Sequence, residues 1–400
     1  MKMLKLRCFR LASPLLGKQG ASYNRPRLLK AALTTLEFWI MSEQKLRGGV
    51  IGLGVGKAHA KGYRTSPDVE LIAVCDSNEE RLQTLAAEWA APVHYTDYRR
   101  MLRETPLDMV SICLPNALHA EATIAALEAG MHVVCEKPMA PTTAAARRML
   151  DAARLHNRHL MIAYNFRYRP DTRWMKQMAQ SGALGTIYQA NVSWRRETGI
   201  PGSGWFGAKT LAGGGALIDL GVHVIDLSLW MMGFPAAKTV SGDTRRLFGP
   251  RGLKTWGSRP PGQPRPDFDV EDGGVGFIRL ANGAHMIVLA TWAEHNQPQE
   301  DAIRVELQGT EGTAVLHIRN YRTDDTLRFY TEMHGEPVTV VLSPRFGGPQ
   351  GHEALIHDLA ACLRRDLPVP TDGEQGLAAI QILEALYESA ATGREVALDG

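Results

Sequence analysis

The stretch DMVSICLPNALHAEATIAALEAGMHVVCEKP, from Asp108 to Pro138, holds a strand, a helix and a second strand in succession. Both strands are largely continuous apolar runs without the alternation of a half-exposed strand, so each is expected to be buried on two faces. The helix between them is expected to end at Gly130, a residue typical of helix C-termini. Two such strands joined by one helix predict a parallel sheet with a right-handed crossover.

The same alternation continues on both sides of this segment. Upstream strands are expected at RGGVIGLG, VELIAVCD and PVHY, each followed by a helical segment, and a helix over 142–157 leads to a last strand in RHLMIAYNF. Regular alternation of this kind predicts a doubly wound α/β domain. We assign it to residues 46–166.

The strand-helix rhythm stops near Arg169, and we assign residues 167–400 to a second α/β domain. Helices are expected at 171–182, 213–230, 352–365 and 376–390. Strand-like runs are expected at 186–197, 273–293, 302–318, 326–332 and 337–342.

Charge is unevenly distributed along the 400 residues. Residues 1–40 hold eight basic residues and one acidic residue, which leaves 37 basic and 41 acidic groups in the remainder. A mildly acidic body argues against nucleic acid as a partner. The basic leader has two interpretations, a transit peptide or a true start at Met41, of which we favour the second, and it is excluded from the fold either way.

Composition also bears on the compartment. The five cysteines show no CxxC spacing, and three of them fall in or at the end of apolar strand-like runs, a pattern typical of a reducing compartment. No window reaches the roughly 20 apolar residues of a membrane helix. We expect a cytoplasmic protein that does not bind membranes.

The first strand ends in GLGVGKAH, where Gly52, Gly54 and Gly56 form a glycine-rich turn before a helix. Such a turn allows a pyrophosphate to approach backbone amides at the helix N-terminus, although the third glycine comes one residue earlier than in GxGxxG. Asp76 ends the second strand, about twenty residues further on, where a carboxylate can bind the adenosine ribose. Its alternative role is to cap the next helix. Together these features predict NAD binding, with NADP possible.

CEKP ends the fifth strand and places Lys137 at the edge where ligands of parallel sheets bind. A bond before proline can be cis, which would direct this side chain inward. A cation there would stabilise a developing alkoxide. The alternative is a solvated surface lysine.

GGGALIDLGVHVIDLSLW, residues 213–230, is mostly apolar but includes Asp219, His223 and Asp226. On a helix these three fall in a stripe roughly 60° wide. The stripe either faces a polar pocket or is a histidine–aspartate pair that satisfies itself in the core. In the first case His223 is the proton acceptor opposite Lys137, and Asp226 is structural, as a partner for His223 or a helix–sheet contact.

These motifs occur in an order that is similar to one known family. GLGVGKAH, LPNALHAE, CEKPMA, YNFRYRP, GGGALIDLGVHVIDL and LQGTEGTAVL together resemble the Gfo/Idh/MocA family of glucose–fructose oxidoreductases and inositol dehydrogenases, over some 350 residues from about Gly48. The resemblance implies a Rossmann domain followed by a domain with a large, open, mostly antiparallel sheet. It also implies a homodimer or homotetramer that assembles through that sheet.

The resemblance assigns roles to residues that match the family motifs. Lys137, Asp219 and His223 are implied as catalytic residues. Cofactor contacts are expected at the glycine turn, Asp76 and Lys137, and at Pro115, Asn116, His119 and Glu136. Substrate contacts are expected at Lys137, Asn165, Arg167, Asp219 and His223.

The expected reaction is hydride transfer between NAD(P) and a secondary alcohol or ketone of a sugar, sugar derivative or cyclitol. Trp205 and Phe206 either face such a sugar or fill their own loop. One alternative function is a hydrolase or lyase that cleaves glycosidic bonds with tightly bound NAD as transient oxidant. Others are metal chemistry at Asp219 and His223, which lacks a third ligand and is opposed by Lys137, and a non-catalytic dinucleotide sensor. We assign no metal ligand.

Overall fold

Six parallel strands form a sheet in the spatial order β3-β2-β1-β4-β5-β6. The computed structural model describes residues 44–202, 204–257 and 262–398, so the predicted leader lies outside the described residues. All residues of β4 are buried, as the apolar run predicts. The strands are β1 (Leu46–Ile51), β2 (Val69–Cys75), β3 (Val93–Tyr95), β4 (Met109–Ile112), β5 (His132–Cys135) and β6 (Leu160–Ile162).

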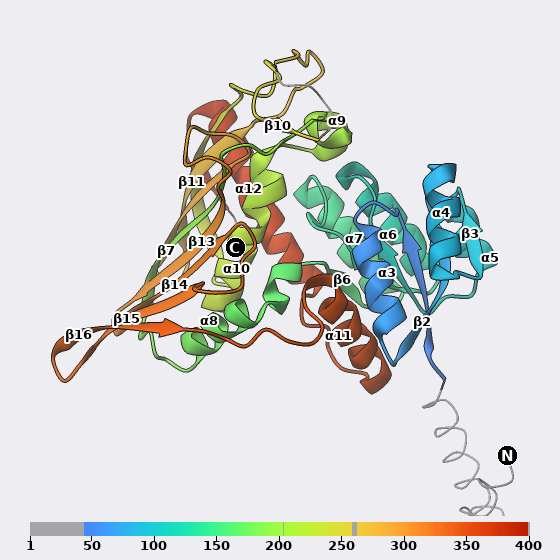
Figure 1. Ribbon diagram of the computed structural model, residues 1–400, viewed down its shortest axis with the longest axis horizontal. Coiled ribbons are helices and arrows are strands. Elements are labelled where there is room, and N and C mark those ends of the chain that lie inside the picture. The colour runs from blue at the N-terminus through green and yellow to red at the C-terminus, as the bar shows by residue number, and fades with distance from the viewer. Residues whose placement is uncertain (1–43, 203, 258–261, 399–400) are drawn as a thin grey trace, which may run out of the picture. The chain divides into compact units, whose positions relative to one another are not determined.

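Helices cover both faces of this sheet (Figure 1). One face packs against α3 (Gly56–Thr65), α4 (Glu79–Trp89) and α11 (Gly351–Arg365). The other packs against α5 (Tyr98–Glu104), α6 (His119–Glu128) and α7 (Thr143–Leu155). The predicted doubly wound domain is confirmed.

Helix α11 comes from the far end of the chain, yet it lies beside α3. Lys61 and Glu353 join the two helices by an ion pair of 2.7 Å. Leu355, Ile356 and Leu359 are fully buried in the same apolar cluster as residues of β1, β2 and α3.

The second sheet has nine strands, in the order β16-β15-β14-β13-β7-β12-β11-β9-β17. All neighbours are antiparallel except β7 and β12, so the large, mostly antiparallel sheet implied by the family resemblance is confirmed. Its strands are β7 (Ile187–Arg196), β9 (Ala237–Arg245), β11 (Gly273–Leu280), β12 (His285–Thr291), β13 (Asp301–Gly309), β14 (Gly312–Arg319), β15 (Leu327–Met333), β16 (Glu336–Leu342) and β17 (Val396–Ala397).

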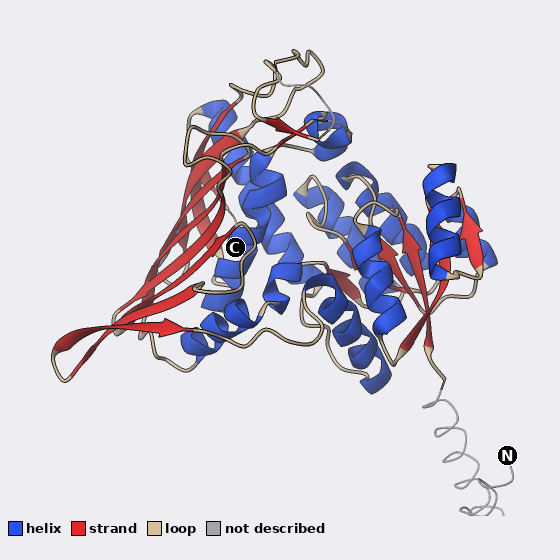
Figure 2. Cartoon of the chain, viewed as in Figure 1, coloured by secondary structure: helices blue, strands red, loops and turns tan. Residues whose placement is uncertain are grey.

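Figure 2 shows helices against one face of this sheet. They are α8 (Pro170–Gln180), α10 (Val222–Met232) and α12 (Gly373–Thr392). Strand alternation places Val192, Val305 and Leu316 on the covered face, where they are buried. The other face carries exposed apolar residues: Val275, Ile287, Tyr330 and Val341.

The predicted helix over 213–230 is less regular than expected. A π-helical turn, η5 (Leu217–Gly221), precedes α10, and a short helix, α9 (Lys209–Ala212), precedes both. The segment Lys209–Met232 is long and apolar enough to cross a membrane, but 83% of its most apolar window is buried inside the protein. Burial of this extent is typical of a core helix.

Four strands of the structure were not predicted from the sequence. β9 reads AKTVSGDTR, in which small and polar residues hide the apolar alternation. β17, β8 (Ile200–Pro201) and β10 (Thr255–Trp256) have only two residues each, too few for any period to show.

Candidate active site

The glycine turn after β1 fits a dinucleotide pyrophosphate. Gly52 has a φ of 89°, and a Cβ at this position would lie 2.2 Å from the carbonyl oxygen of Cys113, so only glycine is tolerated. A Cβ on Gly54 would meet no atom within 4 Å, which leaves this side of the turn open. Helix α3 begins at Gly56 without a side-chain cap, so its first amides are available to an anion.

Asp76 lies at the end of β2 and is 95% buried. Its carboxylate accepts hydrogen bonds from the amides of Leu53 and Asn78, both at 2.8 Å, and from two guanidinium nitrogens of Arg81 at 2.8 and 2.9 Å. Burial raises the pKa of Asp76, but these bonds outweigh it and lower the pKa, so the residue is ionised. Asp76 therefore links the glycine turn to α4 by hydrogen bonds, and it also places a negative charge at the end of β2.

Lys137 follows β5, and its bond to Pro138 is cis, the isomer considered from the sequence. Its ammonium donates to Asp219 twice, to Oδ1 at 2.9 Å and to the backbone carbonyl at 3.1 Å. The other carboxylate oxygen of Asp219 accepts from the indole of Trp292 at 2.9 Å. Burial raises the pKa of Asp219, but the charges of Lys137 and Arg196 and these bonds lower it overall. A fixed ammonium–carboxylate pair results.

His223 lies on the first turn of α10 and is 94% buried. Its Nδ1 has no hydrogen-bond partner among the described residues. Phe166 and Trp194 pack against the imidazole, with ring centroids 5.0 and 5.3 Å away. Burial, assisted by the charge of Lys137, holds the pKa of His223 well below its usual value, so the ring is neutral.

The π-turn over Leu217–Gly221 holds Asp219 and directly precedes the helix that carries His223. The carboxylate of Glu271 accepts hydrogen bonds from the backbone amides of Gly215 and Leu217, at 2.7 and 2.9 Å, and these bonds fix the start of the turn. The turn adds a residue relative to an α-helix, so the 100° spacing used for the predicted stripe does not hold across Asp219.

A pocket of about 510 Å³ is lined by Lys137 of the Lys137–Asp219 pair and by His223. It brings together Lys137, His223 and Asn165, all of which the sequence indicated. Sequence reasoning missed its aromatic wall of Trp194 and Tyr321, which no motif distinguishes from core residues. The remaining lining residues are Val55, Ala58, Lys61, Glu136, Phe166, Arg169, Gln350, Gly351, His352 and Glu353.

Arg167, an expected substrate contact, is paired with protein groups and does not line this pocket. Its guanidinium binds Asp226 through two nitrogens, at 2.5 and 2.9 Å, and also donates to Gln375 and to the carbonyl of Pro370. Both charged side chains are at most 2% exposed. Asp226 therefore pairs with Arg167, not with His223, and turns away from the pocket.

Two expected cofactor contacts have protein partners instead. The ring nitrogens of His119 lie 2.8 Å from the carbonyl oxygens of Pro138 and Leu114, so its side chain links the turns after β5 and β4. Asn116 donates its side-chain amide to the carbonyl of Ala212 at 2.8 Å, which joins the same edge to α9. Both residues are buried, and their hydrogen bonds hold together the turns that follow β4 and β5.

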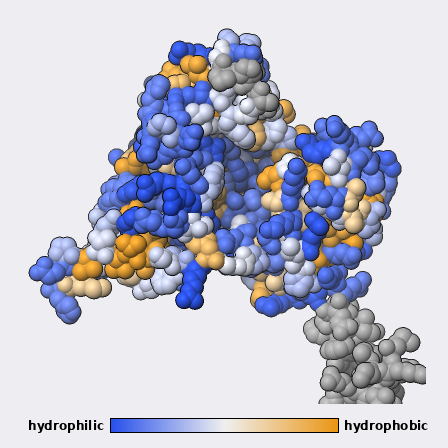
Figure 3. Space-filling model, in the orientation of Figure 1, coloured by the Kyte–Doolittle hydropathy of each residue, from blue (hydrophilic) through white to orange (hydrophobic). Residues whose placement is uncertain are grey.

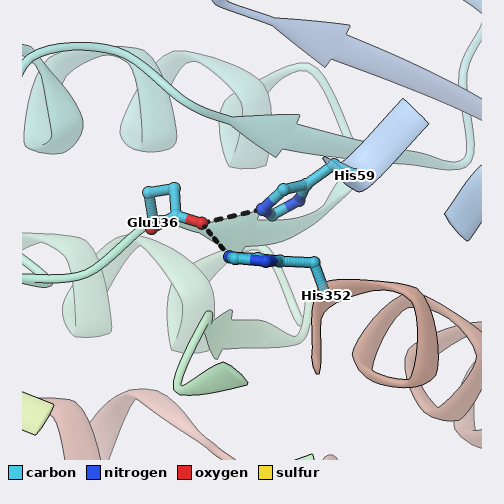
Figure 4. Close-up of side chains that lie close together, drawn as sticks. All are labelled: His59, Glu136 and His352. Atoms are coloured by element: carbon cyan, nitrogen blue, oxygen red, sulfur yellow. Dashed lines mark hydrogen bonds and ion pairs between the residues drawn. The ribbon is translucent and has the colours of Figure 1, made fainter. Parts of the chain in front are cut away.

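Glu136 is also held by protein groups, as Figure 4 shows. Its Oε1 lies 2.8 Å from Nε2 of His59 and 2.9 Å from Nε2 of His352. The two histidines come from α3 and α11, and neither was predicted from the sequence to be a functional residue.

Trp205 and Phe206 stack on each other, with ring centroids 4.0 Å apart. Neither lines the pocket with His223. Of the two interpretations of this pair, the loop-filling one fits the structure.

Comparison with known proteins agrees with this geometry. Residues 46–164 match the family model described as "Oxidoreductase family, NAD-binding Rossmann fold", and residues 172–315 match the GFO/IDH/MocA C-terminal domain. D-glucoside 3-dehydrogenase of Escherichia coli is 34% identical over 360 residues, which cover 90% of this chain and 99% of that protein. Levoglucosan dehydrogenase of Pseudarthrobacter phenanthrenivorans is 33% identical over 302 residues, covering 71% and 76%.

Solved structures show the same likeness. Levoglucosan dehydrogenase in complex with NADH and levoglucosan superposes with a TM-score of 0.77 at 28% identity, over 89% of this chain and all of that one. GenD2 from gentamicin A biosynthesis, in complex with NAD, gives a TM-score of 0.73 at 29% identity, over 89% and 97%.

Proposed function

The chain belongs to the Gfo/Idh/MocA family of NAD-binding oxidoreductases, and from this premise we propose that it oxidises a ring hydroxyl of a D-glucoside. Family membership makes it an NAD(P)-dependent dehydrogenase. The names of two relatives, a D-glucoside 3-dehydrogenase and a levoglucosan dehydrogenase, support a sugar substrate. The pocket supports it too, because an aromatic wall faces hydrogen-bonding groups, the combination that suits a pyranose ring.

The observation that supports the mechanism is the Lys137–Asp219 pair, because Lys137 lines the same pocket as His223. Bound NAD would supply the hydride acceptor. His223 accepts the hydroxyl proton of the substrate, for which a neutral ring is required. Lys137 stabilises the developing alkoxide, and Asp219 holds Lys137 in place for that role. The open side of Gly54, the amides of α3 and the carboxylate of Asp76 would hold the dinucleotide.

Substrate assays test this function. The protein is given NAD with methyl D-glucoside, levoglucosan, D-glucose or myo-inositol, and NADH formation and products are followed. We expect a keto-glucoside and stoichiometric NADH from the methyl glucoside. Release of methanol without net NADH would instead favour the glycoside-cleaving alternative. Turnover of myo-inositol alone would contradict the proposed substrate class.

The proposal extends to assembly and compartment. The exposed apolar residues on the uncovered face of the nine-stranded sheet suit an interface with a second copy, in a homodimer or homotetramer. Free Cys75, Cys113 and Cys135 are buried, which fits the reducing cytoplasm. Light scattering of the wild type and of an Ile287→Lys variant tests the interface, since a charge there should lower the mass.

A further inference from the structure

We propose that His59, Glu136 and His352 form a binding site for one divalent transition-metal ion of the Zn²⁺ class. The three ligand atoms lie within 4.8 Å of one another and come from α3, the end of β5 and the start of α11 (Figure 4). The proposal does not depend on the proposed hydride transfer, because it concerns an ion that would link α3, the end of β5 and α11.

The donor set is the first argument. Two imidazole nitrogens and one carboxylate oxygen constitute a common ligand set for Zn²⁺ sites with an open position. Glu136 and His59 are 96% and 100% buried. Within the described chain the ion-pair contacts of Glu136 are with these two histidines, and no lysine or arginine contributes a permanent positive charge. A buried carboxylate in this position favours a cation.

The outer contacts of His59 are the second argument. Its Nδ1 lies 2.9 Å from the hydroxyl of Ser111, which in turn lies 3.0 Å from the hydroxyl of Tyr63. Metal-binding histidines are usually oriented by such a bond at the second ring nitrogen. Nε2 of His59 is therefore directed at Glu136 by a buried chain of hydrogen bonds.

Access is the third argument. The side chain of His352 is 17% exposed, and both His352 and Glu136 line the pocket. An ion can therefore reach the three ligands from the pocket. The open coordination position of the bound ion would face the pocket. Lys137 also lines this pocket, but its ammonium is neutralised by Asp219. Tetrahedral Zn²⁺ ligands lie about 3.3 Å apart, so the rings of His59 and His352, now 2.8 and 2.9 Å from Oε1 of Glu136, would move away from it by about 0.5 and 0.4 Å.

Metal binding to the intact protein tests the site. Chelator-treated protein is titrated with ZnCl₂ by calorimetry, and Co²⁺ is added separately to record its visible ligand-field spectrum. We expect one equivalent of Zn²⁺ per chain, a tetrahedral Co²⁺ spectrum and a rise in thermal midpoint of about 3–4 °C at roughly 100-fold excess of free Zn²⁺ over Kd.

His352→Gln is the matched variant, because glutamine keeps a donor for Glu136 but removes the imidazole ligand. It should lose the bound equivalent and the Co²⁺ spectrum. His357→Ala, on the same helix, and His159→Gln, at the stacked pair of His132 and His159, should keep both. Absence of stoichiometric binding in the wild type, or equal binding by His352→Gln, would overturn the proposal.

Discussion

The ammonium of Lys137 lies 2.9 Å from Oδ1 of Asp219, across 82 positions of sequence. The contact joins the end of β5, in the cofactor sheet, to the π-turn that precedes α10. With the second bond from this ammonium, to the backbone carbonyl of Asp219, it links the two halves of the proposed catalytic site.

The first prediction concerns this pair. Lys137→Met should lower kcat by about 10²–10³, because the alkoxide loses its charged donor. Asp219→Asn should lower it less, since the lysine remains but is held by a weaker acceptor. Steady-state kinetics measure both, with Lys176→Met, outside the pocket, as the control. Near-normal turnover of Lys137→Met would remove the lysine from the mechanism.

The second prediction concerns pH. The pKa of His223 is lowered well below 6.5, so the base is protonated only under distinctly acidic conditions. The acid limb of kcat/KM for alcohol oxidation should therefore lie well below pH 6.5, with little change between pH 8 and 6.5. His223→Ala should abolish this limb, whereas His285→Ala on β12 should leave it intact. A limb centred at 6.5 would mean that another group, or a solvated His223, controls the profile.

The third prediction separates two glycines of one turn. Gly52→Ala should unfold the cofactor edge, because its Cβ meets a backbone carbonyl at 2.2 Å and its φ is positive. Gly54→Ala should fold normally but bind NADH more weakly, because its Cβ occupies the open side of the turn. Thermal midpoints and fluorescence titrations distinguish the outcomes. Unchanged NADH affinity in Gly54→Ala would place the pyrophosphate elsewhere.

The fourth prediction concerns Asp76 and the choice of cofactor. Asp76→Ser removes a charge that repels a 2′-phosphate and frees Arg81 to bind one. The ratio of NADPH to NADH affinity should rise at least about tenfold, a change of about 1.4 kcal/mol. Fluorescence titration with both cofactors checks this, with Glu80→Gln on α4 as the charge control. A wild type that already prefers NADPH would contradict this role of Asp76.

The fifth prediction concerns the buried pair of Arg167 and Asp226. Arg167→Met should cost about 3–5 kcal/mol of unfolding free energy, because it leaves an unpaired buried carboxylate. The double variant Arg167→Met with Asp226→Leu should recover much of that loss. Urea unfolding measures the stability of each. If the single variant were stable but raised KM strongly, Arg167 would be a substrate contact after all.

The sequence predicted the cofactor sheet well because its strands are apolar on both faces and its turns carry glycine, aspartate or proline at the ends. It also indicated Lys137 and His223, since an isolated charge or histidine in an apolar run is conspicuous. The pairing of Arg167 with Asp226 could not be predicted, because proximity to a motif does not reveal a partner that lies 59 positions away. Trp194, Tyr321 and His352 escaped because only the folded chain brings them to the pocket.

Helix α11 has a consequence for how the protein is synthesised. One face of the six-stranded sheet is completed by residues 351–365, so a nascent chain that already includes Gly52, Gly54, Gly56 and Lys137 still lacks the helix that packs against α3. This face of the six-stranded sheet is therefore completed only after α11 has been synthesised. A chain terminated before Gly351 would carry the whole dinucleotide motif but would lack the helix that packs against α3.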